Sequence, residues 1–303
     1  MEIVRFAKAL SDEVRARLVS LLLRFELNVG ELVQALGMGQ SRISRHLKIL
    51  ADCGLIECRR EGLWAFYRVA GSGAGRDFLE RVADLFVDGA AGEADRERAE
   101  RVIAERVRAT RRFFDTIAAD WQRLSREILG SFDLAGEIRR RLPECGVVAD
   151  LGCGPGELLA ALVSKAGRLI GVDNSPRMLA LAGERFAGNP KVGLRIGELN
   201  HLPMRDWEAD CAVLSMVLHH VPNPKEALVE AGRVLKLGGS LIVAEFDRHE
   251  LESMRSDYGD HRLGFERAAL TALLEQARFK VVKAEAFPVN RGLSVVLYEC
   301  VKR

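Results

Sequence analysis

A glycine-rich segment, VVADLGCGPG at residues 147–156, follows an apolar run and ends where a helical pattern begins. Asp150 stands at the end of the apolar run, and three glycines at alternate positions then let the backbone turn tightly against a ligand. The helix that follows points its positive N-terminal end at that ligand. Asp173 comes 17 residues after the last glycine, where an acidic side chain accepts hydrogen bonds from ribose hydroxyls. Together these features predict a nucleoside-binding site.

A second group of polar residues lies at the start of a short predicted helix, residues 40–52. A preceding helix and the turn Gly37-Met38-Gly39 make the pattern a helix-turn-helix. Ile43, Leu47 and Leu50 recur at helical spacing and face inward, so the polar residues face outward. Those outward residues are Gln40, Ser41, Arg42, Ser44, Arg45 and His46.

A helix of this kind fits the major groove of DNA, where Arg and Gln form paired hydrogen bonds with base edges. We predict that Arg59 and Arg60, at the tip of the following hairpin, reach phosphates or the minor groove. The alternative is an ordinary three-helix module with a solvated basic face. Charge favours DNA only weakly: residues 1–75 hold 11 Lys and Arg against 8 Asp and Glu, whereas the whole chain has a net charge of +2.

The segment with SRHLKIL followed by GLI and a hairpin resembles the ArsR/SmtB family of winged-helix repressors over nearly all of residues 5–69. The resemblance implies that residues 40–46 belong to the recognition helix and residues 57–68 to the wing. It also implies a homodimer on a palindromic operator in double-stranded DNA. Metal sensors of that family carry ELCVCDL before the turn, but this chain has ELNVGEL, so Asn28 and Gly30 replace the thiolates. We therefore expect no metal there and an effector of another kind.

Residues 131–303 alternate short apolar runs with helical segments. Such a pattern predicts an α/β domain with a mostly parallel sheet that helices cover on both faces. No helix separates the last two runs, so we expect the final strand to be antiparallel. The predicted strands are 146–151, 169–172, 192–196, 211–215, 240–246, 280–286 and 294–301.

The glycine-rich segment, together with GELNHLP, LSMVLHHVPNP and RVLKLGGSLIVAE, resembles a class I S-adenosylmethionine-dependent methyltransferase domain over about residues 113–303. The resemblance implies a Rossmann-like seven-stranded sheet that binds S-adenosylmethionine (SAM) or S-adenosylhomocysteine (SAH). Its implied contacts are Asp150, Gly152, Cys153, Gly154 and Gly156 for the methionine part; Asp173 for the ribose; Asn174, Met178, Glu198 and Leu199 for the adenine; and Ser215 and Met216 beneath the sulfonium.

No residue set identifies the catalytic groups. Methyl transfer depends mainly on alignment, and a base is needed only when the acceptor carries a proton. His219 and His220 follow the fourth predicted strand and could supply a base, although packing or capping is the commoner role. Residues 247–265 form a substrate pocket, a lid or a dimer contact. Arsenic methylation needs converging thiols, and Cys145, Cys153, Cys211 and Cys300 lie in separate elements, so we do not expect it.

The composition is that of an ordinary globular chain of 303 residues, with 48% apolar and 29% charged residues. Six cysteines without C-x-x-C spacing indicate reduced thiols, and we find no signal peptide or membrane span, so we expect a cytoplasmic protein. We predict a DNA-binding domain at 1–72, a helical connector at 73–129 and the methyltransferase-like domain at 130–303. The connector is either a solvated helix or a dimerisation helix. The second alternative arises because its apolar stripe from Phe78 to Phe86 must be buried against something.

Chains that join an ArsR-type DNA-binding domain, here called the reader, to a methyltransferase-like domain form a recognisable group, which this chain resembles from end to end. The group includes regulators that respond to SAH. The resemblance therefore implies a transcriptional repressor with SAM or SAH as its effector. The alternative is an active small-molecule methyltransferase that carries a DNA-binding module, and the two share every binding residue.

Overall fold

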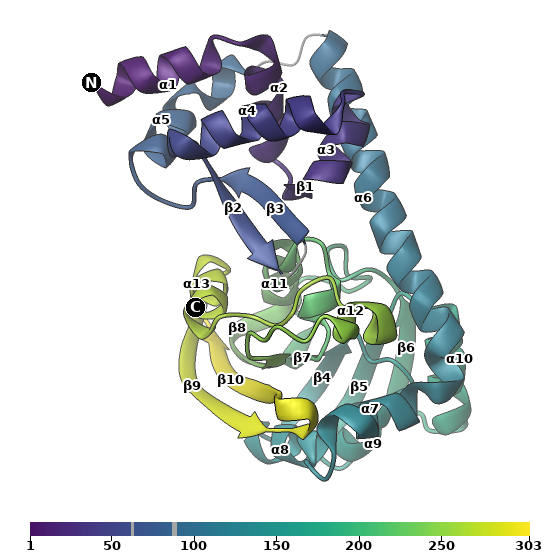
Figure 1. Ribbon diagram of the computed structural model, residues 1–303. Coiled ribbons are helices and arrows are strands. Elements are labelled where there is room, and N and C mark those ends of the chain that lie inside the picture. The colour runs from purple at the N-terminus through teal and green to yellow at the C-terminus, as the bar shows by residue number, and fades with distance from the viewer. Residues whose placement is uncertain (62–63, 87–89) are drawn as a thin grey trace. The chain divides into compact units, whose positions relative to one another are not determined.

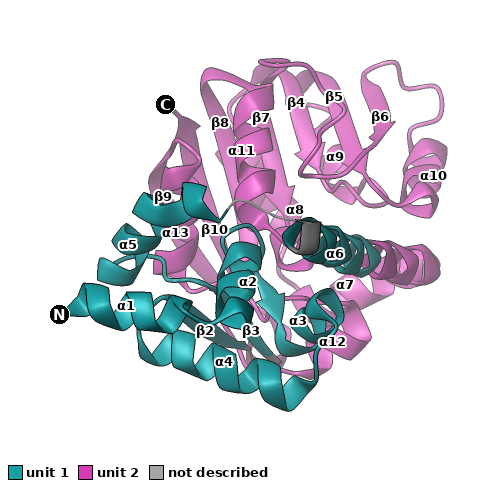
Figure 2. Ribbon diagram, turned by 90° about the horizontal axis from the view of Figure 1, so that it is seen from above, with its two compact units in different colours: residues 1–107 teal, residues 108–303 magenta. Residues whose placement is uncertain are grey.

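The computed structural model describes residues 1–61, 64–86 and 90–303. The chain divides into two compact units, Met1–Val107 and Arg108–Arg303, which Figure 2 colours separately. The division differs from the predicted boundaries at 72 and 129. The long helix α6 (Ala90–Ile117) contributes residues to both units.

Unit 1 is mainly helical and contains a small antiparallel sheet with the strand order β1-β3-β2 (Figure 1). The predicted hairpin is confirmed, with Ile56 opposite Val69. Its predicted turn includes Gly62, which lies outside the described residues. The elements are α1 (Glu2–Leu10), α2 (Glu13–Leu22), β1 (Leu27–Asn28), α3 (Val29–Leu36), α4 (Gln40–Asp52), β2 (Ile56–Glu61), β3 (Trp64–Val69), α5 (Ala74–Val82), the 3-10 turn η1 (Ala83–Leu85) and the first part of α6.

Local capping chemistry sets the helix starts in this unit. Asn28 accepts a hydrogen bond from the Glu31 amide, and the Glu31 carboxylate accepts one from the Asn28 amide, so the two residues form a capping box. The N-terminal cap of α2 directly follows Ser11. Asp12 is the cap, and its carboxylate accepts from the Arg15 amide at 3.1 Å. A carboxylate at this position also interacts favourably with the helix dipole.

The apolar stripe of α5 packs into the core of unit 1 itself. Leu79 is fully buried, and the Phe78 ring lies 5.2 Å from the ring of Phe6 on α1. Most of the stripe is therefore covered within unit 1, whereas Leu85 at its far end is 79% exposed.

Ion pairs attach the first part of α6 to the helix-turn-helix. The buried Asp95 accepts hydrogen bonds from Arg17 on α2 at 2.6 and 2.8 Å. One turn away, Arg98 donates to the Ala35 carbonyl at the end of α3. Arg106 pairs with Glu31, the residue that closes the capping box. Residues far apart in sequence thus hold the reader together.

Unit 2 is built on a seven-stranded sheet with the order β6-β5-β4-β7-β8-β10-β9 (Figure 1). β10 pairs antiparallel with both β8 and β9, as predicted, and the other pairs are parallel. The strands are β4 (Cys145–Leu151), β5 (Ala166–Asp173), β6 (Val192–Ile196), β7 (Ala209–Ser215), β8 (Leu235–Phe246), β9 (Phe279–Pro288) and β10 (Ser294–Lys302).

Helices cover both faces of this sheet. Alternate β7 residues enter opposite cores: Ala212 and Leu214 pack in one, Cys211 and Val213 in the other. Burial on both faces explains why the strands read as continuous apolar runs. Beyond α6, the helical elements are η2 (Ala118–Asp120), α7 (Trp121–Leu129), α8 (Leu134–Arg141), α9 (Glu157–Leu162), α10 (Pro176–Arg185), η3 (Leu218–His220), α11 (Pro224–Val234), α12 (Ser253–Tyr258), α13 (Arg267–Gln276) and η4 (Asn290–Gly292). Within the described parts of the chain, no helix combines the length and the apolarity that crossing a membrane requires.

We predict that Asp95→Ala destabilises unit 1 by about 2–3 kcal/mol, because it removes hydrogen bonds to a charged group and leaves the Arg17 guanidinium without that partner. Urea denaturation followed by circular dichroism measures the change. The matched control is Glu97→Ala on the same helix, whose carboxylate is 65% exposed and should contribute less than about 0.5 kcal/mol. Equal effects of the two substitutions would contradict the role of Asp95.

Candidate functional site

The glycine-rich turn leaves β4 with its backbone open to a ligand. Gly152, Gly154 and Gly156 have φ values of 87°, 50° and 77°, a region that other residues rarely adopt. A Cβ atom on Gly152 would lie 2.5 Å from the Val217 side chain, so no side chain fits there. A Cβ atom on Gly154 would meet nothing within 4 Å. The turn therefore packs tightly on one side and is accessible on the other.

Asp173, at the end of β5, is hydrogen-bonded to this turn. Its carboxylate accepts from the Gly154 amide and from the Ser175 amide, each at 2.9 Å. Burial raises the pKa of Asp173, and the backbone amides that donate to it lower the pKa and partly offset this effect. Each carboxylate oxygen can accept a further hydrogen bond, as contact with a ribose diol requires. The predicted pairing of the turn with Asp173 is thus present in the structure.

Asp150 is a second buried carboxyl group behind the turn. It is only 1% exposed, and its Oδ2 atom has no hydrogen-bond partner. Burial and the nearby charge of Asp173 raise its pKa to about 7. A hydrogen-bond donor on a bound ligand would satisfy this oxygen and favour the ionised form.

The remaining predicted contacts follow the carboxyl ends of neighbouring parallel strands, which meet at one edge of the sheet. Met178 is buried, and its amide donates to Ser175 Oγ, which caps α10. Met216 follows β7 in a left-handed conformation with a φ of 54°. The residues at this edge are Cys153, Asn174, Met178, Glu198, Leu199, Ser215 and Met216; Glu198 is exposed and Cys153 is buried.

The last part of α6 packs on the loops at this edge, a contact that the sequence analysis missed. Ser175 Oγ donates to Asp115 at 2.6 Å. The Phe114 ring meets the His220 ring edge-on at 4.7 Å, and Thr110 is hydrogen-bonded to His261. The sequence signal was the aromatic pair at 113–114, which interrupts an otherwise highly charged helix.

A cluster of buried ionisable side chains follows β7. His219 Nδ1 is 2.6 Å from Glu245, whose other oxygen accepts from the Val217 and Leu218 amides. Burial alone would lower the pKa of His219, but the negative charges of Glu245 and Asp260 raise it to about 9. Burial and the nearby His219 lower the pKa of His220 well below its usual value. These histidines are therefore hydrogen-bonded and ionisable as well as packed. Sequence spacing did not identify Glu245 as a partner of His219.

The recognition helix α4 presents the predicted residues almost as expected. Ile43, Leu47 and Leu50 are fully buried, and most of the polar residues on the opposite face are exposed. His46 is the exception: its side chain is only 13% exposed, and its Nδ1 atom lies 3.7 Å from Asp12. The exposed members are Gln40, Ser41, Arg42, Ser44 and Arg45.

The two wing arginines differ. Arg59 lies within β2 rather than at the hairpin tip, forms two hydrogen bonds with Glu26 and stacks over the Phe66 ring. The prediction that Arg59 lies at the tip is therefore corrected. The pair with Glu26, 33 positions away, is a tertiary contact that local pattern does not reveal. Arg60 is exposed on the same strand.

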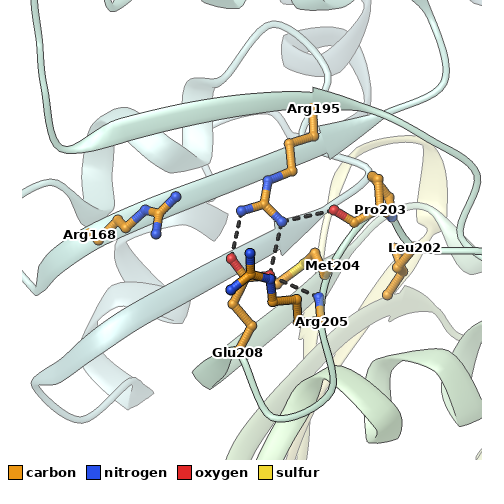
Figure 3. A pocket seen from close by; sticks show the side chains of 7 residues that line it. All are labelled: Arg168, Arg195, Leu202, Pro203, Met204, Arg205 and Glu208. Carbon is orange, nitrogen blue, oxygen red and sulfur yellow. Dashed lines mark hydrogen bonds and ion pairs between the residues drawn. The ribbon is translucent and has the colours of Figure 1, made fainter.

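A surface hollow of about 540 Å³ contains none of the predicted cofactor contacts (Figure 3). Arg195 forms two hydrogen bonds with Glu208 there and donates to the Pro203 carbonyl at 2.8 Å. This pairing lowers the pKa of Glu208 to about 2. The lining residues are Arg168, Arg195, Leu202, Pro203, Met204, Arg205 and Glu208. The Arg195–Glu208 contacts join the end of β6 to the loop before β7, which is a structural role.

Two family models match separate parts of the chain. Residues 12–57 match the bacterial regulatory protein arsR family, and residues 149–243 match the methyltransferase domain family. The chain thus combines an arsR-family helix-turn-helix domain with a methyltransferase domain.

Curated relatives match single parts of the chain. An uncharacterised 37.1 kDa protein in transposon Tn4556 of Streptomyces fradiae is 44% identical over 114 residues, which are 37% of this chain and 32% of that protein. A demethylmenaquinone methyltransferase of Staphylococcus aureus is 31% identical over 48% of this chain and 64% of its own length. An arsenite methyltransferase of Halobacterium salinarum is 34% identical over 32% of this chain and 26% of its own length. The chain spans only about a third to three fifths of the first such relatives.

Solved structures share the fold of unit 2. A SAM-dependent methyltransferase from Thermotoga maritima, described as a possible histamine N-methyltransferase, aligns with a TM-score of 0.51 and 26% identity over 63% of this chain and 98% of its own. Geranyl diphosphate C-methyltransferase from Streptomyces coelicolor aligns with a TM-score of 0.51 and 14% identity over 56% of this chain and 78% of its own.

We predict that Asp173→Ala weakens binding of both SAM and SAH by about 1.5–3 kcal/mol, because hydrogen bonds to a charged group are lost. Isothermal titration calorimetry measures the change. Glu184→Ala, which removes an exposed carboxylate from α10 of the same unit, is the control and should leave both affinities unchanged. Full affinity in Asp173→Ala would remove this residue from the site.

We predict that Arg42→Ala and Arg45→Ala each weaken specific DNA binding by about 1–3 kcal/mol without changing the affinity for SAM or SAH. Fluorescence anisotropy on an operator that the intact protein selects from random DNA gives the numbers. Arg139→Ala removes an exposed cation from unit 2 and controls for net charge. Specific binding that survives the loss of both Arg42 and Arg45 would overturn the assignment of α4.

Proposed function

We propose that this protein is a cytoplasmic, dimeric transcriptional regulator whose methyltransferase domain binds SAM or SAH as an effector that changes its affinity for DNA. The observation that carries the proposal is α6, a single helix with contacts to the reader at one end and to the candidate ligand loops at the other. The dimer and the palindromic operator rest on the resemblance to ArsR/SmtB repressors.

At its start, α6 belongs to the reader. Asp95 holds Arg17, and Arg106 holds the Glu31 carboxylate that closes the capping box of α3. The helix before the recognition helix is therefore fixed partly by residues of α6. A shift of α6 would therefore alter these ion pairs and, through them, the support that α3 receives.

At its end, α6 belongs to the ligand domain. Asp115 accepts from Ser175, and Ser175 donates its amide to the Asp173 carboxylate. A ligand that engages Asp173 thus acts two residues away from the hydrogen bond to α6. Coupling between two sites requires an element whose equilibrium both sites bias, and α6 has the contacts for that role.

Active methyl transfer is the second candidate function. The buried His219 and Asp260 favour it, because groups with perturbed pKa values concentrate at sites of chemistry. Similarity to methyltransferases of several substrate classes supports transfer without naming an acceptor. SAM turnover with candidate acceptors, followed as SAH release, tests this function independently of DNA binding.

The deciding experiment for the regulator is operator binding titrated with SAM and with SAH. An effector must bind the DNA-competent and DNA-free states with different affinities, so saturation should shift operator affinity by about five-fold or more. Ligand saturation that leaves operator affinity unchanged, while calorimetry shows the ligand bound, would eliminate the regulator proposal in favour of the enzyme.

We predict that Asp115→Ala reduces the effect of ligand on operator affinity by about 0.5–2 kcal/mol, because the hydrogen bond that joins α6 to Ser175 is lost. Operator affinity without ligand should stay the same. Asp120→Ala removes a carboxylate that is 63% exposed and serves as the matched control. An unchanged ligand response in Asp115→Ala would show that coupling does not pass through this contact.

A further inference from the structure

Three side chains in the cluster after β7 converge as metal ligands do. His219, His220 and Asp260 each offer one ligand atom, and these atoms all lie within 4.8 Å of one another. Asp260 Oδ1 is 3.6 Å from His219 Nε2 and 3.9 Å from His220 Nδ1. Tetrahedral ligands about 2.0–2.2 Å from a zinc ion lie roughly 3.3–3.6 Å apart, so the Asp260–His219 separation already fits and the other ligand atoms would have to move closer together. The geometry points to a binding site for one divalent transition-metal ion of the zinc class.

Asp260 supplies an independent observation for this site. The residue is 4% exposed, and both of its carboxylate oxygens lack a hydrogen-bond partner. An unsatisfied buried charged group costs more than about 1–3 kcal/mol, so native proteins seldom retain one without a purpose. Its Oδ1 atom faces the two imidazoles rather than a backbone donor. A cation between these three groups would satisfy the carboxylate.

Glu245 prepares His219 as a ligand. Its carboxylate lies 2.6 Å from His219 Nδ1, so Nδ1–H donates to it, and a metal ion that displaces the proton on Nε2 would find that nitrogen directed toward Asp260. Two backbone amides, from Val217 and Leu218, hold Glu245 in turn. A carboxylate that orients a metal-bound histidine in this way is a recurrent feature of zinc sites.

His220 is held more loosely. Its Nδ1 atom lies 3.2 Å from the Gly259 carbonyl, and its ring packs against Phe114. Coordination through Nδ1 would replace that hydrogen bond and shift the ring proton of the neutral imidazole to Nε2. Two imidazoles and one carboxylate favour zinc, cobalt or iron over magnesium, which prefers oxygen ligands. Three protein ligands leave one position for water or another molecule.

This inference differs from the sequence expectation of no metal, which rested on the missing thiolates of the reader. Here His219 and Asp260 are 41 positions apart, and only the fold brings them together. The proposed ion joins residues 247–265 to the end of β7. It thus assigns a role to a segment for which the sequence left three alternatives.

The test uses the full-length protein, treated with a chelator and then dialysed. Calorimetry with Zn²⁺ should find one site per chain, and Co²⁺ should give the visible absorption of a four-coordinate nitrogen and oxygen site without thiolate charge-transfer bands. Asp260→Asn should weaken Zn²⁺ binding by 100-fold or more. Asp257→Asn, which changes an exposed carboxylate in the same segment, should leave it unchanged.

Glu245→Gln tests the positioning role separately. It should weaken Zn²⁺ binding by about 10- to 100-fold while keeping the Co²⁺ spectrum of the same ligand set. Circular dichroism confirms that each variant is folded. Absence of stoichiometric binding, binding that Asp260→Asn leaves intact, or thiolate bands in the Co²⁺ spectrum would each overturn the proposed site. All of these readouts are independent of DNA binding and of SAM.

Discussion

The partly buried carboxylate of Asp173 needs hydrogen-bond donors, and much of the candidate ligand-binding edge of the sheet is arranged around supplying them. The amides of Gly154 and Ser175 provide two. Gly154 can present its amide because it has no side chain and adopts a positive φ. Ser175 is then held in place, where its hydroxyl both caps α10 and binds Asp115. The hydrogen bonds that the Asp173 carboxylate requires therefore connect the glycine-rich turn, the end of β5 and the long helix α6.

The buried carboxylates of the two units differ in whether they have hydrogen-bond partners. In unit 1 the buried carboxylates Asp95 and Glu31 have guanidinium partners, so their charges are compensated within the fold. In unit 2, Asp150 and Asp260 are buried without hydrogen-bond partners for at least one oxygen. The first arrangement stabilises a structure, and the second is one that a bound ligand or ion would stabilise.

Predictions that rest on local chemistry agree well with the structure. The bounds of α4, the hairpin after it and the succession of apolar strands along the chain all follow from periodicity and from local turn and helix signals. The cap of α2 is harder to predict, because Ser11 and Asp12 are both good caps by residue type and only the backbone geometry selects Asp12.

The sequence was insufficient for predictions that depend on partners far away along the chain. Arg59 was placed at the hairpin tip because nothing near it in sequence reveals Glu26 as its partner. Glu245 ends a strand whose pattern indicates only burial, and Asp260 lies in a segment without regular spacing. The packing of the end of α6 was missed for the same reason. A highly charged helix is expected to be solvated, and the sequence does not show that the Phe114 ring packs on His220.

The continuity of α6 also limits how this chain can be dissected. A reader shortened to residue 72 would lose Asp95 and Arg106, and would leave Arg17 and Glu31 without these partners. A cut at 107/108 would create two new helix ends inside one element, each with up to about four unsatisfied backbone groups. The smallest fragment that keeps the DNA-reading surface intact therefore extends well into the long helix, and an expression boundary chosen by motif alone would divide a folding unit.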